Sequence, residues 1–380
     1  MATLAKQANR YYRCLGYRED PEPIDLLCPP RRLSYLHQLL QVVEAQLEGA
    51  GLVFFVTWKL DKLPEYGDHV VAIVMGDEWS QIPDYVDRVL VTFKCYGIYP
   101  QLAVRLLRRP SYLNTLVFLR YLRVLVHWLP GALRYAGRYM RNRLRGQQMP
   151  PIYDMPLGYG NQQDLPMQPI ETRPIDVFFA GSIEQGFPKR LWSPHRWLPG
   201  PKRVSRMHML RVLEDLQSRM PELKVWVHTN TRFVLNALEY GLTQPGEVLD
   251  TEAYSQTLMH SKICLAPRGT SADTFRLFEG LRYGCVVITE RLPKRWFYQE
   301  APVLQVDDWR ELQVLVPKLL QNPYHMQQLS EAALHWWQTV GSEEAVGQWM
   351  AQKIRACLAV QHTKAPKPID LTDAHSDRYP

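Results

Sequence analysis

The chain has 380 residues, of which 46% are hydrophobic, and this is enough for two domains with separate cores. Its six cysteines form no Cys-x-x-Cys pair and no metal-binding spacing, which argues against a disulfide or zinc framework and favours a reduced, cytosolic setting. The N-terminal stretch MATLAKQANRYYR has no apolar segment, so we expect no signal peptide. The formal net charge of +7 is unevenly placed, because residues 88–153 contain no acidic residue.

The first part of the chain has the pattern of an α/β domain. Residues 1–30 are rich in Tyr, Pro and charge and predict no regular element, whereas residues 33–47 have the leucine spacing of a helix. Three β-rich runs follow, at residues 52–57, 70–75 and 89–93. Because these runs are almost continuously apolar, they predict a parallel sheet that is covered on both faces. We assign residues 1–146 to this first domain.

Two acidic residues follow the second of these runs, in the sequence Gly76-Asp77-Glu78-Trp79. Ligands of α/β folds bind at the carboxyl ends of the strands, which makes Asp77 and Glu78 candidates for the functional site. The alternative is that one of them caps the next helix. The sequence leaves both interpretations open.

Residues 103–145 carry ten arginines and no acid, with Leu, Phe and Trp between the charges. Residues 112–130 are interrupted too often by Arg and His to span a bilayer, so the pattern favours an amphipathic helix in the headgroup plane of an anionic membrane. An ordinary helix pair with solvated arginines is the main alternative, and nucleic-acid binding is disfavoured because no recognised module accompanies the charge. The expected membrane-surface residues are Arg105, Arg108, Arg109, Arg120, Arg123, Trp128 and Arg134.

Residues 147–174 are rich in Pro, Gln and Met and predict a linker. A second domain is expected over residues 175–340, beginning with a strand at 176–180 that ends in Gly181-Ser182. A basic run follows that can hold a diphosphate, although solvated loop charge explains most of it equally well: Lys189, Arg190, His195, Arg196, Lys202, Arg203 and Arg206. Further helices are expected at 207–216, 229–238, 251–260, 309–320 and 324–340, and strands at 224–228 and 302–306. A last helix at 343–358 is expected to cross back to the first domain, before a disordered tail at 361–380.

The central motif is Ile263 to Glu290, ICLAPRGTSADTFRLFEGLRYGCVVITE. It predicts a strand, a loop, a helix over residues 272–283 that ends at Gly284, and a second strand. Thr270 with Asp273 three residues later is a variant of the capping box at the start of that helix.

The loop of this motif has the chemistry of a phosphate site. Unpaired N–H groups at a helix N-terminus favour anions, and Arg268, Gly269, Thr270 and Ser271 add a fixed cation, a close backbone approach and two hydroxyl donors. Arg276 and Glu279 are expected about two turns inside the helix, where only a nucleotide lying along its flank reaches them. A purely structural corner is the alternative.

The same residues resemble the signature of exostosin-like glycosyltransferases. The stretches are Lys262 to Gly269, Arg276 to Leu281 and Gly284 to Ile288, similar to "K-x-C-L-x-P-x-G … R-x-x-E-A-L-x-x-G-C-I-P-V-I", with Gly280 in place of Ala and Val287 in place of Pro. Gly67 to Val70 with Gly76 to Trp79 is similar to the family's "D-H-F … H-D-W", with Gly76 in place of His. Met155 to Gly160 and Asp176 to Gly181 also resemble stretches of these transferases.

This resemblance implies a GT-B fold, that is, two Rossmann-like domains facing each other across a cleft. It implies inverting transfer of a sugar from a nucleotide diphosphate-sugar to a sugar or glycolipid acceptor, in polysaccharide or glycolipid synthesis, with no cofactor and no metal. The implied donor-binding residues are Gly181, Ser182, Arg268, Gly269, Thr270, Ser271, Arg276 and Glu279, and the base is Asp77 or Glu78, with His69 next. We expect a cytoplasmic enzyme, peripheral on the inner face of the membrane and without a nucleic-acid partner. A catalytically silent scaffold or nucleotide-binding protein of the same fold is the alternative.

Overall fold

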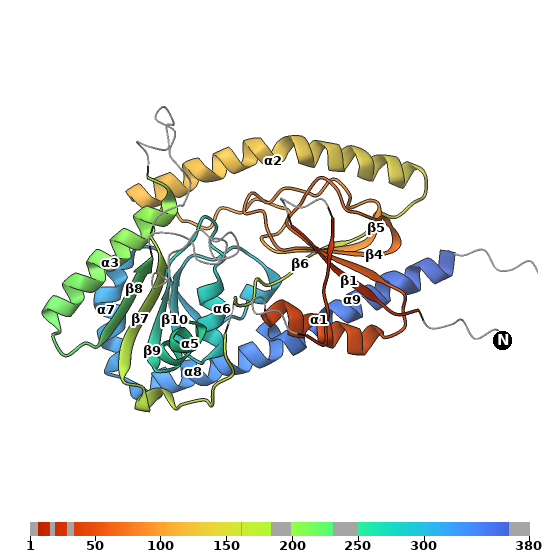
Figure 1. Cartoon of the computed structure of the whole chain (residues 1–380). Helices are drawn as coiled ribbons and strands as arrows, with labels where there is room; N and C mark the ends of the chain where they lie inside the picture. The colour runs from red at the N-terminus through yellow and green to blue at the C-terminus, as the bar shows by residue number, and fades with distance from the viewer. Residues whose placement is uncertain are drawn as a thin grey trace, which may run out of the picture.

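The structure is a computed structural model that describes residues 7–15, 20–28, 34–160, 162–183, 199–230 and 250–364. It consists of two α/β units, each built on its own sheet (Figure 1). The first sheet has the order β2-β1-β3-β4-β5-β6, and every neighbouring pair is parallel except β1 with β2. Its strands are β1 (Arg10–Cys14), β2 (Glu22–Pro23), β3 (Val53–Thr57), β4 (Gly67–Val74), β5 (Val89–Lys94) and β6 (Ile152–Asp154).

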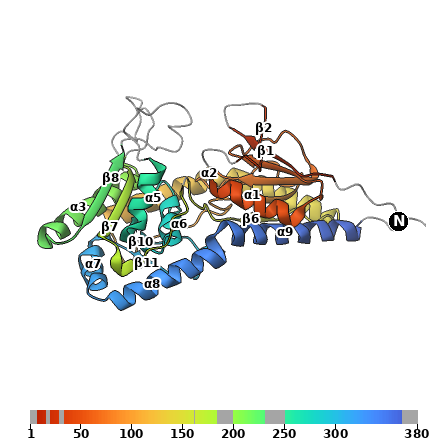
Figure 2. The same cartoon turned by 60° about the horizontal axis from the view of Figure 1, so that its bottom comes forward.

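Two helices from opposite ends of the chain cover one face of this sheet. Helix α1 (Ser34–Leu47) packs beside helix α9 (Glu343–Lys364), which runs under the first unit (Figure 2). Gly347 allows the close approach, because a Cβ at that position would lie 2.8 Å from the Val42 side chain. All five residues of β3 are buried, which explains why four of them, Val53 to Val56, are apolar. The C-terminal helix therefore belongs structurally to the N-terminal unit.

The second sheet is entirely parallel and has the order β11-β10-β9-β7-β8. Its strands are β7 (Ile175–Ser182), β8 (Val225–Asn230), β9 (Ser261–Ala266), β10 (Val286–Glu290) and β11 (Val303–Val306). The described helices of this unit are α3 (Pro201–Arg219), α5 (Thr251–Met259), α6 (Phe275–Arg282), α7 (Leu312–Leu320) and α8 (Pro323–Trp336), with short 3-10 or π turns at Ile170–Thr172, Trp296–Tyr298, Trp309–Glu311 and Trp337–Gly341. The chain leaves β7 toward β8 and later returns to the other side of β7 as β9. A crevice-forming switch point therefore lies between the carboxyl ends of β7 and β9.

Residues 112–144 form one long helix, α2 (Tyr112–Leu144), and not the helix pair considered from the sequence. The Ser111 side chain caps its first turn, and Pro130 lies within it. In Figure 1, α2 crosses the top of the molecule from α3 of the second unit to the sheet of the first. Its inner face is held along its length, because Trp128 donates to the Ile98 carbonyl and Arg138 to the Asp84 carbonyl.

Other differences from the predicted elements lie near the ends of the first unit. Residues 10–14 form a central strand although their sequence is rich in Tyr and Arg, and residues 152–154, assigned to the linker, form the edge strand β6. Both segments obtain their strand conformation from pairing with neighbours, and neither has an apolar run of its own. Helix α9 continues to Lys364, into the expected tail, while the helix expected at 229–238 and the tail from 365 lie outside the described residues.

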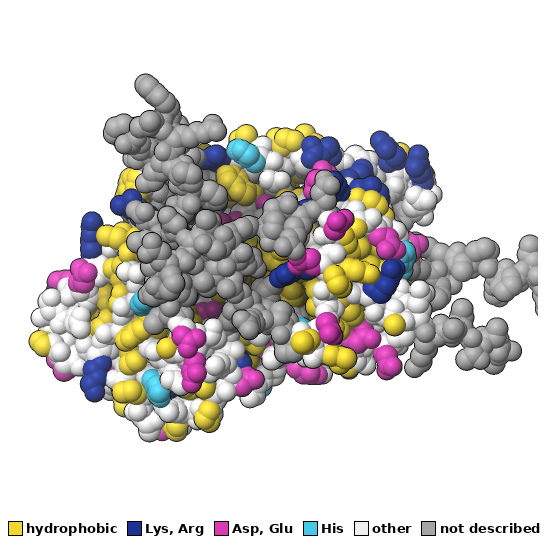
Figure 3. Space-filling view, in the orientation of Figure 1, with side chains coloured by type: hydrophobic (Ala, Val, Ile, Leu, Met, Phe, Trp, Pro, Cys, Tyr) yellow, Lys and Arg dark blue, Asp and Glu magenta, His cyan; other side chains and the backbone are white. Residues whose placement is uncertain are grey.

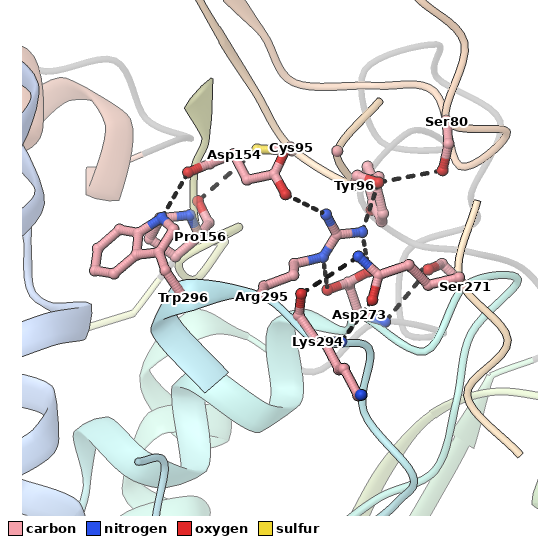
Figure 4. A network of polar contacts seen from close by, with 12 residues as sticks. Ser80, Cys95, Tyr96, Asp154, Pro156, Ser271, Asp273, Lys294, Arg295 and Trp296 are labelled. Atoms are coloured by element: carbon pink, nitrogen blue, oxygen red, sulfur yellow. Dashed lines mark hydrogen bonds and ion pairs between the residues drawn. The ribbon is translucent and has the colours of Figure 1, made fainter. Parts of the chain in front are cut away.

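The two units face each other with the loops that follow the carboxyl ends of their strands. Arg295 of the second unit forms ion pairs with Asp273 at 3.2 Å and with Asp154, the last residue of β6, at 3.1 Å (Figure 4). It also donates to the Tyr96 carbonyl in the first unit. Two mostly parallel α/β sheets arranged in this way confirm the expected fold class, α/β of the GT-B type.

The two departures from the exostosin-like pattern in the central motif compensate each other. Gly280 of α6 lies against Val287 of β10, and a Cβ at position 280 would lie 2.8 Å from Val287 Cγ2 and 3.1 Å from Cys264. Gly280 thus makes room for the branched side chain of Val287. The Gly76 departure has a similar cause, since a Cβ there would lie 2.7 Å from the Trp58 ring.

We predict that Gly280→Ala lowers the free energy of unfolding by about 1–2 kcal/mol, because overpacking outweighs the better helix propensity of alanine. The double variant Gly280→Ala/Val287→Ala should lose less than the sum of the two single variants, since the added methyl fills the space that valine leaves. Urea denaturation measures both. Gly137→Ala is the control, because a Cβ there meets nothing within 4 Å and should stabilise α2 slightly. A stabilising effect of Gly280→Ala would contradict this packing.

Candidate functional site

Two guanidinium groups meet above the backbone of Gly181, where β7 ends at the switch point. A Cβ at position 181 would lie 2.8 Å from Arg276 Nη2 and 3.2 Å from Arg206 Nη1. The Arg276 guanidinium lies 5.0 Å from the centroid of the Phe179 ring, which fixes its plane. A side chain larger than that of glycine would displace both arginines, so position 181 requires glycine for steric reasons.

Helix α3 supplies two cations to the same place. Lys202 Nζ donates to Ser182 Oγ at 2.7 Å, and Arg206 donates to the Ser182 carbonyl and to the Arg268 carbonyl. Both lie near the start of α3, where the helix dipole disfavours positive charge. Lys202, Arg206, Arg268 and Arg276 are called the cationic cluster below.

The loop of the central motif is longer than the sequence predicts. Helix α6 begins at Phe275 with Thr274 as N-cap, four residues after the expected cap Thr270. The capping box does not form because the Asp273 carboxylate pairs with Arg295 and accepts from the Ser271 hydroxyl. Arg276 therefore lies in the first turn of α6 and faces the carboxyl end of β7, which corrects its expected place two turns inside the helix.

Few carboxylates balance the cationic cluster. Glu290, at the end of β10, accepts from the Arg268 amide at 2.8 Å and from Ser205 Oγ at 2.9 Å, and lies 3.7 Å from Arg268 Nε. Among the described residues, neither Arg206 nor Arg276 forms an ion pair. Several buried polar atoms also have no hydrogen-bond partner within the described part of the chain: Arg268 Nε, Arg276 Nε, Thr274 Oγ1 and Arg120 Nη2. An anionic ligand at this place would give the three guanidinium nitrogens and the hydroxyl a hydrogen-bond partner.

Burial destabilises the charges of this cluster. Burial and the neighbouring Arg206 lower the pKa of Lys202 to about 8. Burial and Arg276 lower the pKa of Arg206 to about 9. Both shifts have the direction expected when cations are desolvated beside one another, and a bound anion would reverse them.

The first unit contributes Glu78, which faces the cationic cluster from the loop after β4. Its carboxylate accepts a hydrogen bond from Thr270, and Arg120 and Lys202 are its charged neighbours. Burial raises the pKa of Glu78 above the usual value in spite of these three favourable contacts. A carboxyl group with a raised pKa beside a phosphate-type site is suited to accept a proton near neutral pH.

Asp77 has a structural role in the same loop. Its carboxylate accepts from the amides of Trp79 and Gln81 and forms an ion pair of 3.1 Å with Lys94. Both partners are almost fully buried, with 0% of the Lys94 side chain and 5% of the Asp77 side chain exposed. Asp77 also has a φ of +77°, so this ion pair holds the strained turn that presents Glu78. The geometry therefore favours Glu78 over Asp77 as the base.

His69 lies away from this site. It stands near the amino end of β4 and pairs with Glu65 at 2.6 Å. The strand between His69 and Met75 separates it from Glu78 by roughly 20 Å, at about 3.3 Å per residue. His69 is therefore not brought together with the other candidates.

Arg120 is a site residue that the sequence analysis assigned to the membrane surface. It lies on the inner face of α2, near Glu78 and Arg268, with its guanidinium 5.1 Å from the Trp79 ring centroid. The inward position of Arg120 could have been predicted from helical periodicity, because it shares one helical stripe with Leu113, Val117 and Val124. Trp128 continues this stripe and is likewise corrected, since its indole N–H donates to Ile98.

The remaining predicted residues have varied surroundings. Glu279 is buried and accepts from the Tyr254 hydroxyl at 2.6 Å, in the second turn of α6. Gly269 has no contact closer than 3.6 Å at its Cβ position, so no steric need for glycine exists there. Arg203 is exposed, and Lys189, Arg190, His195 and Arg196 lie outside the described residues. No group of three or more His, Cys, Asp or Glu side chains in the described ranges gathers into a metal site, and metal-independent action stays a prediction.

Comparisons with known proteins show only distant similarity. No protein-family model and no curated protein matches the sequence, so the exostosin-like resemblance stays a prediction. The structure is similar to a sucrose-phosphate synthase from Thermosynechococcus elongatus, with 16% identity, a TM-score of 0.43, and 86% of this chain and 93% of that chain covered. It is also similar to a glycosyltransferase from Rickettsia africae, with 8% identity, a TM-score of 0.44, and 93% and 99% covered. A GtfA/B complex shows 11% identity, a TM-score of 0.38, and 85% and 60% covered. Similarities of this size assign no role to any residue of the chain.

We predict that binding of a nucleoside diphosphate at pH 8 takes up protons. Lys202 is about half neutral there because its pKa is lowered to about 8, and the bound anion favours its charged form. Affinity should accordingly fall as the pH rises above 8. Calorimetric titrations in two buffers of different ionisation enthalpy measure the uptake, and Lys202→Met should remove most of it, because Arg206, with its pKa lowered to about 9, is mostly charged at pH 8. Equal binding heats in both buffers for the unmodified protein would contradict the assignment.

Proposed function

We propose that the protein is a glycosyltransferase that moves a sugar from a nucleotide diphosphate-sugar to an acceptor hydroxyl with inversion. One observation carries this proposal: a buried, incompletely neutralised cationic cluster at the switch point of one unit faces a glutamate of raised pKa from the other. The first feature suits a diphosphate and the second suits a proton acceptor. The motif resemblance to exostosin-like transferases supports the same reaction.

The donor diphosphate would lie between the ends of β7 and β9. Lys202, Arg206 and Arg276 converge on Gly181 and Ser182, and the first turn of α6 adds its free N–H groups. Arginine forks match phosphate oxygens in pairs, which fixes the orientation of the ligand. Glu279, deeper in α6, would accept from hydroxyls of the nucleoside or the sugar.

The chemical step would be a single displacement at the anomeric carbon. The acceptor oxygen forms a bond to that carbon while the bond to the diphosphate oxygen breaks, and the nucleoside diphosphate leaves with the electron pair. The acceptor proton passes to the carboxylate of Glu78. Because attack and departure occur on opposite faces, the configuration inverts. The cationic cluster would stabilise the charge that develops on the leaving diphosphate.

We predict that Arg206→Ala and Arg276→Ala each weaken binding of the preferred nucleoside diphosphate by about 10- to 150-fold, since each removes a charge-assisted contact of about 1.5–3 kcal/mol. Calorimetric titration with UDP, GDP and ADP measures the effect. Arg203→Ala is the matched control, because Arg203 is on the same helix as Arg206 but exposed, and its loss should leave affinity unchanged. Unchanged affinity in both variants would show that the donor diphosphate does not bind at the cationic cluster.

We predict that Glu78→Gln slows turnover by about 10²–10⁴ while leaving nucleotide affinity and the melting temperature nearly intact. Slow hydrolysis of the nucleotide-sugar, with water as acceptor, provides a readout that needs no known acceptor. Since the pKa of Glu78 is raised, the rate should fall with decreasing pH earlier than for an ordinary glutamate and stay level above that pKa. Asp77→Asn should instead lower stability by about 3–5 kcal/mol, because it leaves the buried ammonium of Lys94 with carbonyl acceptors but no counter-ion. Full activity of Glu78→Gln would place the base elsewhere, and hydrolysis absent from the unmodified protein would favour the silent scaffold.

A further inference from the structure

The outward face of α2 carries a continuous apolar stripe. Its exposed members recur every three or four residues from Leu119 to Leu133, and one more follows two turns later: Leu119, Leu122, Val126, Leu129, Leu133 and Met140. From Leu119 to Met140 the stripe is about 30 Å long, at roughly 1.5 Å per residue. A row of apolar side chains exposed to water is typical of a surface that binds another protein or a membrane, and this stripe is called the docking face below.

Basic residues flank this stripe, and α2 itself carries no acidic residue, although Arg134 forms an exposed ion pair with Asp84 of the first unit at 3.6 Å. Arg123, Arg134, Arg141 and Arg143 are exposed on α2, and Arg145 follows its end. Residues 88–153 contain no Asp or Glu at all. Figure 3 shows hydrophobic and basic side chains together along the edge of the molecule that α2 forms in that view. We propose that this face of α2 lies on the surface of an anionic lipid bilayer.

An apolar stripe can bind either a second copy of the chain or a lipid bilayer, and the charges beside it distinguish between the two. A second copy of the chain would bring arginines against arginines with no carboxylate on either helix, and like charges at such an interface oppose association. An anionic bilayer offers phosphate oxygens to the arginines and an apolar interior to the leucines. The composition of α2 therefore fits lipid and disfavours a symmetric dimer.

The packing of α2 fits a helix that lies on the bilayer and does not cross it. By length and composition alone, α2 is the one helix in the described residues that is long and apolar enough to span a membrane. Its inner face is nevertheless held against both units: Leu116 and Val117 are buried, Trp128 donates to Ile98, and Arg138 donates to Asp84. Crossing the bilayer would break all of these contacts.

The position of Arg120 links this surface to the candidate site. Leu119 and Leu122 face outward on the turn from which Arg120 faces inward, toward Glu78. The site is therefore separated from the docking face by about one helix diameter, roughly 10 Å. If the proposed transferase function holds, on which this step rests, the acceptor class is a hydroxyl carried by a membrane lipid.

Sedimentation with vesicles tests the docking face without any transfer assay. We expect the full chain to sediment with vesicles of phosphatidylcholine mixed with phosphatidylglycerol, to stay largely in solution with phosphatidylcholine alone, and to bind less at high salt. Val126→Glu should reduce binding at least about tenfold, since it places a carboxylate at the centre of the stripe. Val314→Glu on α7 is the matched control, because Val126 and Val314 are both 69% exposed, and it should bind as the unmodified chain does.

Three results would overturn the proposal: no binding to anionic vesicles at low salt, equal binding by Val126→Glu, or a dimer in solution that Val126→Glu dissociates. The last result would assign the stripe to a second copy of the chain. Melting temperatures of the two variants show whether either has lost its fold, and Leu122→Ser serves as a milder second variant with the same expected direction. Vesicle binding by a protein that hydrolyses no nucleotide-sugar would support the docking face and contradict the transferase function separately.

Discussion

The convergence of Arg206 and Arg276 on the backbone of Gly181 is the constraint on which the candidate site depends. Two guanidinium groups in a largely buried position repel each other, and removing each from water costs several kcal/mol unless an anion compensates. Glu290 offsets part of this charge through Arg268, but it forms no ion pair with Arg206 or Arg276 within the described residues. The fold holds these charges because the strands and helices behind them are deeply packed, with Phe179, Leu265 and Leu277 fully buried. The packed core thus holds the two arginines close together although they repel each other, and a bound anion would relieve that repulsion.

A second set of contacts determines what faces this site. Arg295 connects the loop of the central motif, through Asp273, to Asp154 and to the Tyr96 carbonyl of the first unit (Figure 4). The same pairing of Asp273 delays the start of α6 and leaves Thr270 available to Glu78. Within the first unit, the buried pair of Asp77 and Lys94 holds the turn that carries Glu78. The position of Glu78 relative to the cationic cluster therefore depends on three ion pairs, and none of them contains a proposed catalytic group.

The sequence predicted the parts of this structure that arise from local pattern. Strands β3, β5 and β9 are built on apolar runs, and Gly284, at the C′ position of α6, has the positive φ of +64° expected at a helix end. Strand β6 is not predictable from the sequence, because its three half-buried residues acquire their conformation only from pairing with β5. The start of α6 was misplaced because the partner of Asp273 comes from Arg295, 22 residues later. The arginine-rich composition of residues 103–145 predicts a surface position for Arg120, whereas its helical phase, shared with Val117 and Val124, places it on the inner face of α2.

The central claim is that the cationic cluster at the switch point binds a diphosphate, and pyrophosphate tests it most directly because it needs no knowledge of the base or the sugar. The measurement is the melting temperature of the full chain as a function of pyrophosphate concentration, with sulfate at equal ionic strength as reference. The account predicts a rise that saturates with pyrophosphate, exceeds that with sulfate, and is strongly reduced in Arg276→Ala. A melting temperature that responds equally to both anions, or that rises equally in Arg276→Ala, would contradict it.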